Sequence, residues 1–167
     1  DEYTAKNPDK PRFVAGSVGP TNKTCSMSPD VNNPAYRALS YDELAASYQQ
    51  QMEAMLEGGV DAILIETIFD TLNAKAAIFA AEQAMKATGV EVPVMLSVTV
   101  SDIGGRTLSG QTLDAFLASV QHANIFSVGL NCSFGARQLK PFLEQLAARA
   151  PYYISAYPNA GLPNSLG

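Results

Sequence analysis

Basic residues are few in this sequence and long apolar runs are missing, and both shortages exclude classes of partner. The chain has 167 residues, with 11 Lys and Arg against 16 Asp and Glu and a net charge of −5. No basic stripe is present that could neutralise a phosphate backbone, so we expect no nucleic acid partner. The longest apolar runs, residues 62–65 and 76–81, are far shorter than the roughly 20 residues that cross a bilayer, so we expect no membrane partner.

Cysteine and histidine are also scarce, which limits metal and disulfide chemistry. The two cysteines, Cys25 and Cys132, belong to no CxxC pair, so a disulfide scaffold is disfavoured and a reducing, cytoplasmic location is expected. Two thiols and the single His122 cannot complete a four-ligand zinc site. No nucleophilic triad and no HExxH motif can be assembled from the sequence, which disfavours hydrolase chemistry.

The chain is too short for a whole (β/α)8 barrel, which needs at least about 200 residues. Its hydrophobic share of 47% still permits a sizeable core in one domain. The first residues contain neither an initiator Met nor the apolar segment of a secretory signal, so we interpret the sequence as an internal fragment of a longer chain. Residues 1–11 are polar and contain two prolines, and we expect them to form a lead-in segment before one incomplete domain, residues 12–167.

Strand-like and helical segments alternate along this domain. Five runs have the nearly continuous apolar character of strands buried in a parallel sheet: residues 13–18, 62–66, 92–100, 126–131 and 152–157. Four segments between them repeat apolar residues at helical spacing, around residues 44–56, 72–80, 113–120 and 139–146. Ser40 and Glu43 match a capping box before the first of these helices. The order βαβαβαβαβ predicts right-handed crossovers and an α/β fold with a parallel sheet.

Two architectures fit this order, an open doubly wound sheet and five consecutive units of a barrel. Doubly wound nucleotide binders usually have a glycine fingerprint directly after the first strand, whereas Pro20 occupies that turn here. Polar residues instead follow every strand, at the end where barrel enzymes place their chemistry. They are residues 19–22, 66–67, 101–102, 131–132 and 158–159. We therefore predict a partial (β/α)8 TIM barrel of about five parallel βα units.

Glu66 and Cys132 are the most reactive side chains at these strand ends. Glu66 closes an apolar strand, where an unpaired carboxylate is costly, so it should meet a substrate ammonium, a structural ion pair or the helix that begins near Thr71. Cys132 lies between a predicted strand end and a predicted helix start, where a thiol is suited to nucleophilic chemistry or metal ligation. A small buried packing residue is the alternative for Cys132 and the preferred reading for Cys25.

Five strings in the sequence, taken together and in order, closely resemble the homocysteine-binding module of the cobalamin-dependent methionine synthase family. The strings are residues 19–22, 65–75, 105–111, 129–132 and 158–164. The resemblance covers the chain from about residue 12 to its end, and the five predicted strands resemble the third to the seventh of eight. It implies a zinc-dependent homocysteine S-methyltransferase barrel that transfers a methyl group from methylcobalamin to zinc-bound homocysteine thiolate and gives methionine. Cobalamin and folate modules of the same polypeptide are the implied partners.

The resemblance also assigns roles to single residues. Three cysteine thiolates hold the zinc in this family, and Cys132 matches the first of them, whereas the other two have no counterpart in this chain. Glu66 is the implied acceptor of the substrate ammonium. Asn131 is expected to hydrogen-bond the amino acid or to position the Cys132 loop, Asn159 to make a polar contact near the metal, and Thr67 to act as a donor behind them.

The resemblance leaves three functions open. The methyl donor can be methylcobalamin, as the strings at residues 71–75 and 158–164 favour, or betaine or S-methylmethionine. A noncatalytic partial barrel is the remaining alternative. No catalytic residue is assigned within the chain, and since one of three thiolates is present, we expect the 167 residues alone to be inactive.

Overall fold

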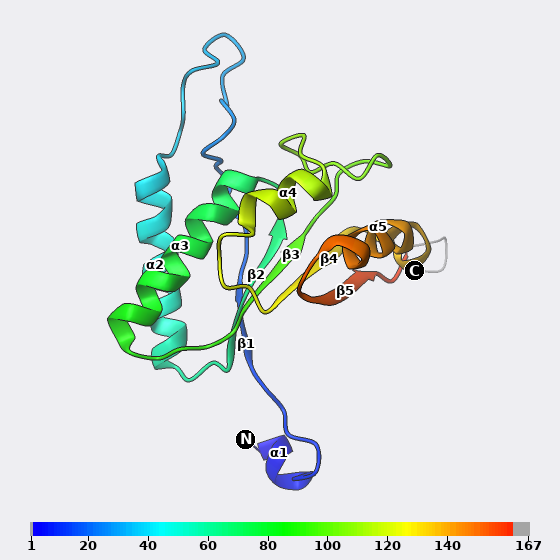
Figure 1. Ribbon diagram of the computed structural model, residues 1–167. Helices are drawn as coiled ribbons and strands as arrows, with labels where there is room; N and C mark the ends of the chain where they lie inside the picture. The colour runs from blue at the N-terminus through cyan, green and yellow to red at the C-terminus, as the bar shows by residue number, and fades with distance from the viewer. Residues whose placement is uncertain (1, 162–167) are drawn as a thin grey trace, which may run out of the picture.

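The computed structural model describes residues 2–161 and contains a single five-stranded parallel sheet (Figure 1). The strands are β1 (Ala15–Val18), β2 (Ala62–Ile68), β3 (Val94–Val98), β4 (Ser127–Gly135) and β5 (Tyr153–Asn159). Their order in the sheet is β1-β2-β3-β4-β5, the same as their order in the chain. A doubly wound sheet reverses its strand order at one point, whereas a barrel adds each strand on the same side of the last. The unreversed order confirms the predicted partial (β/α)8 barrel.

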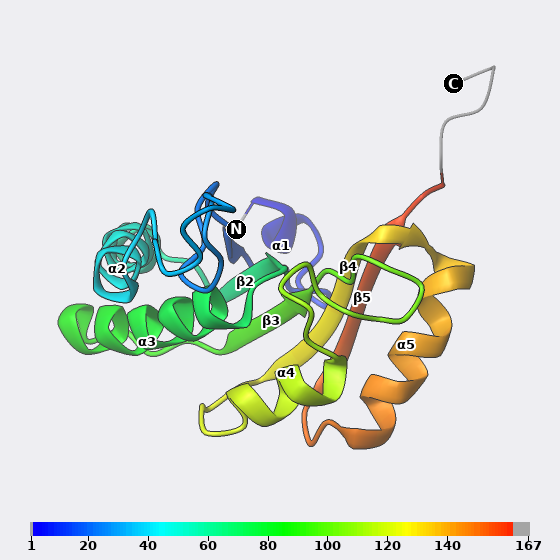
Figure 2. The same cartoon turned by 90° about the horizontal axis from the view of Figure 1, so that it is seen from above.

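The helices between these strands cover one face of the sheet (Figure 2). They are α2 (Tyr41–Glu57), α3 (Thr71–Thr88), α4 (Leu113–Val120) and α5 (Ala136–Arg149), and a short α1 (Glu2–Lys6) precedes the sheet. Helix α1 lies in the segment that we expected to be a polar lead-in, and all its residues are exposed or half-buried. No helix within residues 2–161 has both the length and the apolar character needed to span a bilayer.

Local signals in the sequence set the helix boundaries. The Ser40 hydroxyl accepts from the Glu43 backbone N–H and the Glu43 carboxylate accepts from the Ser40 backbone N–H, which confirms the capping box of α2. Asp70 caps α3 by accepting from the Asn73 backbone N–H at 3.0 Å. Gly89 ends α3 in the left-handed region at φ 70°, which glycine adopts without steric cost.

The hydrophobic core lies between the sheet and α2–α5. Alternate residues of β2, β3 and β4 face these helices and are at most 6% exposed: Ile63, Ile65, Val94, Leu96, Val98, Val128 and Leu130. The helices contribute fully buried side chains that include Leu44, Met52, Phe116, Leu139 and Leu146. Burying each of these side chains contributes about 1.5–3 kcal/mol, so this layer holds the sheet in its register.

The opposite face of the sheet is the one that a closed barrel turns inward. Strand alternation places Ser17, Glu66, Ser97, Gly129 and Tyr157 on this face. Both edge strands are open within the described residues: Phe13 and Val14 before β1 are 77% and 58% exposed, and Tyr153 of β5 is 72% exposed. On the inward face, Glu66 is half-buried and Tyr157 is exposed, whereas Ser97 is fully buried.

Candidate functional site

The carboxyl ends of β2 and β4 are both bulged. The pairing of β2 with β3 shifts between Ile65 and Ile68, and Thr67 in this shift has φ 57°. The pairing of β4 with β5 shifts between Asn131 and Gly135, and Cys132 has φ 58°. Positive φ is uncommon for residues other than glycine, and bulges of this kind redirect side chains at sheet rims and active sites.

The bulges correct two expectations about strand ends. Strand β2 continues to Ile68, so Glu66 lies inside it, and Cys132 lies in the bulged part of β4 instead of in a loop before the next helix. The reason is that β5 pairs with β4 again at Gly135 and Asn159, beyond the bulge. The N-terminus of α5 begins only at Ala136, so Cys132 is not in its first turn.

Asn131 joins the two bulges through four hydrogen bonds and is 1% exposed. Its Oδ1 accepts from the Thr67 backbone N–H at 3.2 Å and from the Ser97 hydroxyl at 2.7 Å. Its Nδ2 donates to Thr67 Oγ1 and to Cys132 Sγ, both at 3.0 Å. The Thr67 N–H can only donate, which fixes the amide oxygen on that side. Because its hydrogen-bonding capacity is taken up within the protein, the amide holds Thr67 and Cys132 in place.

Glu66 lies half-buried on the inward face of β2, and two hydroxyl groups hold its carboxylate. The Ser17 hydroxyl donates to Oε1, and the Tyr157 hydroxyl donates to Oε2 at 2.9 Å. None of the three salt bridges within residues 2–161 involves Glu66, and Asp70 caps α3 in its place. The structural ion pair and the helix cap are therefore not found for Glu66 in the described part of the chain.

Tyr157 reaches Glu66 on the same inward face of the sheet, from the edge strand β5. Burial raises the pKa of the Tyr157 hydroxyl, and its hydrogen bond to Glu66 and the negative charge of Glu66 raise that pKa further. The net direction is upward, so the hydroxyl remains protonated and donates at neutral pH. Neither Ser17, Ser97 nor Tyr157 was among the residues predicted for the site. Their sequence signal is the polar group at an inward position of an otherwise apolar strand.

Cys132 is the metal-ligating group that the site offers. Its thiol is half-buried and accepts from Asn131. No group of three or more His, Cys, Asp or Glu that could hold a metal ion occurs within residues 2–161. A thiolate is a donor that zinc takes, so the chemistry of Cys132 fits one ligand position of a zinc site.

The other predicted site residue, Asn159, is exposed at the end of β5. Its register partner is Gly135, which places it beside the β4 bulge. It forms no side-chain hydrogen bond within residues 2–161 in this structure. The last part of the string that carried the resemblance, residues 162–164, lies outside the described residues.

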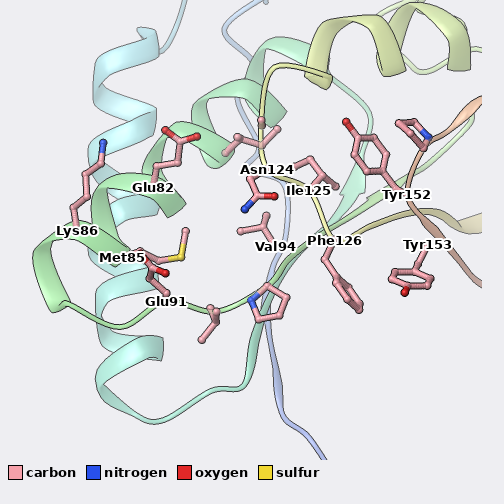
Figure 3. A pocket seen from close by; sticks show the side chains of 15 residues that line it. Glu82, Met85, Lys86, Glu91, Val94, Asn124, Ile125, Phe126, Tyr152 and Tyr153 are labelled. Atoms are coloured by element: carbon pink, nitrogen blue, oxygen red, sulfur yellow. The ribbon is translucent and has the colours of Figure 1, made fainter.

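A hollow is present at the other end of the sheet. It has a volume of about 990 Å³ and lies where the chain enters β3, β4 and β5, against the second half of α3 (Figure 3). Charged side chains at its border include Glu82, Lys86 and Glu91. None of the five predicted site residues lines it, so the predicted chemistry and this hollow occupy opposite ends of the parallel strands.

A parallel sheet in unreversed order, with helices on one face and reactive side chains at the carboxyl ends of its strands, defines a partial barrel of the kind that enzymes use. The homocysteine S-methyltransferase family model matches residues 1–167, and the chain belongs to this family.

Solved structures with the same fold include the apo and metallated forms of the homocysteine methyltransferase MmuM from Escherichia coli. Each has a TM-score of 0.75 and 23% sequence identity to this chain, over 96% of its length. The chain covers 54% of the apo protein and 53% of the metallated one, so it spans about half the length of these enzymes.

Proposed function

We propose that the protein containing this chain is a homocysteine S-methyltransferase, in which Glu66 binds the substrate ammonium and Cys132 is one of the metal ligands. The observation that carries this proposal is the uncompensated carboxylate of Glu66. Two neutral hydroxyls hold it, and no cation of the described chain pairs with it. The family to which the chain belongs supports the choice of homocysteine as substrate.

Glu66 is suited to an ammonium because no cation of the described chain pairs with its carboxylate and because two hydroxyls hold both carboxylate oxygens. A half-buried carboxylate without a countercharge gains from a cation that brings N–H donors. Hydrogen bonds that involve a charged group contribute about 1.5–3 kcal/mol each. The ammonium of an amino acid supplies up to three such donors, so Glu66 would orient the substrate through its amino group.

Cys132 is proposed to hold zinc together with two cysteines from outside this chain. A bound zinc ion would supply one function, which is to keep a coordinated thiol deprotonated near neutral pH. Asn131 would fix the direction of the Cys132 sulfur through its N–H, as groups behind metal ligands commonly do. Thr67 would support the site through Asn131, because its backbone N–H donates to the amide oxygen of Asn131 and its hydroxyl accepts from the amide nitrogen.

Asn159 is proposed to make a polar contact near the metal. Its register position beside Gly135 supports this role, because the same bulge contains Cys132. Since this chain offers one of three thiolates, we propose that the 167 residues alone do not catalyse methyl transfer. We propose that residues 12–167 form one incomplete barrel domain and that residues 1–11 are a lead-in segment before it.

The proposed methyl donor is methylcobalamin, bound with folate by other modules of the same polypeptide in the cytoplasm, and the product is methionine. The resemblance of residues 71–75 and 158–164 to the cobalamin-dependent family supports this donor. Betaine or S-methylmethionine would serve the same site. Cobalamin and folate modules in the polypeptide that contains this chain would favour the first donor, and their absence there would favour the others.

The experiment is a homocysteine binding titration on the intact protein with Glu66→Gln and, as control, the exposed Glu57→Gln. E66Q should bind homocysteine about 10- to 100-fold more weakly, as expected for loss of a charged partner. It should bind 4-mercaptobutyrate, which lacks the amino group, as tightly as the wild type does. Wild-type affinity for homocysteine in E66Q would refute the proposed role of Glu66.

A further inference from the structure

The contact between Tyr157 and Glu66 crosses the width of the sheet. Tyr157 belongs to β5 and Glu66 to β2, with β3 and β4 between them. Tyr157 is the register partner of Asn131 on β4, two residues beyond Gly129. Ser97 of β3 and Gly129 of β4 are register partners on that face. Ser97 is 0% exposed, and its hydroxyl donates to Asn131 Oδ1 at 2.7 Å.

We propose that Tyr157 is a positioning residue that sets the orientation of the Glu66 carboxylate and thereby the selectivity for thiols that carry an amino group. This inference rests on the proposed function of Glu66 as the ammonium acceptor. The Tyr157 hydroxyl holds Oε2 and the Ser17 hydroxyl holds Oε1, so the plane of the carboxylate is fixed at both oxygens. Each oxygen keeps further lone pairs for an ammonium.

The choice of neutral donors is what makes this arrangement selective. A Lys or Arg in place of either hydroxyl would neutralise Glu66 and remove its attraction for a cation. A phenol and an alcohol orient the carboxylate and leave its charge in place. Burial raises the pKa of Tyr157, so the phenol does not ionise beside the carboxylate at neutral pH.

The test is a set of binding titrations on the intact protein with Tyr157→Phe, alone and combined with Glu66→Gln. Removing one of the two hydroxyls that orient the carboxylate should weaken homocysteine binding about 3- to 10-fold in Y157F. Binding of 4-mercaptobutyrate should not change. In the E66Q background Y157F should have no further effect, because Tyr157 acts only through Glu66.

Two further variants guard against a merely structural effect. Ser17→Ala removes the donor at the other oxygen and should give the same pattern as Y157F. Tyr153→Phe removes a hydroxyl from the same face of β5 and should leave both affinities unchanged.

Three results would overturn the proposal about Tyr157: wild-type homocysteine affinity in Y157F, an equal loss of 4-mercaptobutyrate binding, or a full effect of Y157F in the E66Q background. If E66Q weakens homocysteine binding and Y157F does not, only this inference fails. If E66Q has no effect, or the wild type binds no homocysteine, the proposed function fails and this inference fails with it.

Discussion

Replacing Asn131 should separate the stability of the site from its metal chemistry. The amide makes four hydrogen bonds at 1% exposure, two of them from the donors Thr67 N–H and Ser97 hydroxyl. Asn131→Ala leaves both donors without their partner, and a buried donor without a partner costs about 1–3 kcal/mol. We expect N131A to lower the free energy of unfolding by about 2–4 kcal/mol, since Ser97 is fully buried and Thr67 half-buried.

Asn131→Asp has nearly the same shape and should behave differently. It keeps an acceptor for the Thr67 N–H and for Ser97, and the Thr67 hydroxyl can rotate to donate. It also places an anionic oxygen where an N–H now meets Cys132 Sγ at 3.0 Å. Loss of a supporting hydrogen bond to a metal ligand typically lowers metal affinity about 10- to 100-fold. N131D should therefore lose at least 10- to 100-fold in zinc affinity. Its loss of unfolding free energy should be smaller than that of N131A.

The assays are urea unfolding followed by circular dichroism and zinc titration of the intact protein against a chromophoric chelator. Asn124 is exposed just before β4, so N124A and N124D are matched controls that should change neither quantity. The reasoning would be refuted if N131D bound zinc as tightly as the wild type does, or if N131A were as stable as the wild type.

Two further predictions concern packing and pH. Gly129→Ala should destabilise the chain by about 3 kcal/mol or more, because the new Cβ would lie 2.2 Å from the backbone oxygen of Ser155, whereas Gly19→Ala meets no atom within 4 Å. Urea midpoints check this, and equal stability of G129A and G19A would contradict the close approach of β4 and β5. Burial raises the pKa of Tyr48 to about 12, and its hydroxyl donates to the Gly19 carbonyl at 3.1 Å. An unfolded chain loses this proton near its ordinary value of 10.0, so the stability that Tyr48 contributes is present below pH 10 and is lost as the pH rises from 10 toward 12. The Y48F variant should show a smaller loss of unfolding free energy over that range, and an unchanged pH dependence would contradict the assignment.

The presence of the strands and the helix boundaries could be predicted because their signals are local. The capping residues Ser40 and Glu43 and the terminating Gly89 lie within a few residues of the helix ends that they set. The continuous apolar runs indicated strands buried in a parallel sheet. The short exposed α1 has no buried face, so hydrophobic periodicity did not reveal it.

The geometry of the site could be predicted only in part. Strand alternation assumes regular pairing, so the predicted strands ended at Glu66 in β2 and at Asn131 in β4, where bulges with positive φ interrupt the register. The partners of Glu66 are 49 and 91 positions away in the sequence, and they meet it only because five strands align in one sheet. The residue types at the rim could be identified in the sequence. Which hydroxyl groups bond to them could not, because these contacts form only in the tertiary structure.

Zinc content is the most direct test of the claim that Cys132 belongs to a methyltransferase metal site. The intact protein and its Cys25→Ala and Cys132→Ala variants would be dialysed against a mild chelator and their bound zinc measured. Cys25 is buried in the loop after β1, where its backbone N–H bonds to Asn73, and it is not a proposed ligand, so C25A should retain one zinc per chain as the wild type does. The account predicts that C132A loses the metal, and full retention of zinc by C132A would contradict it.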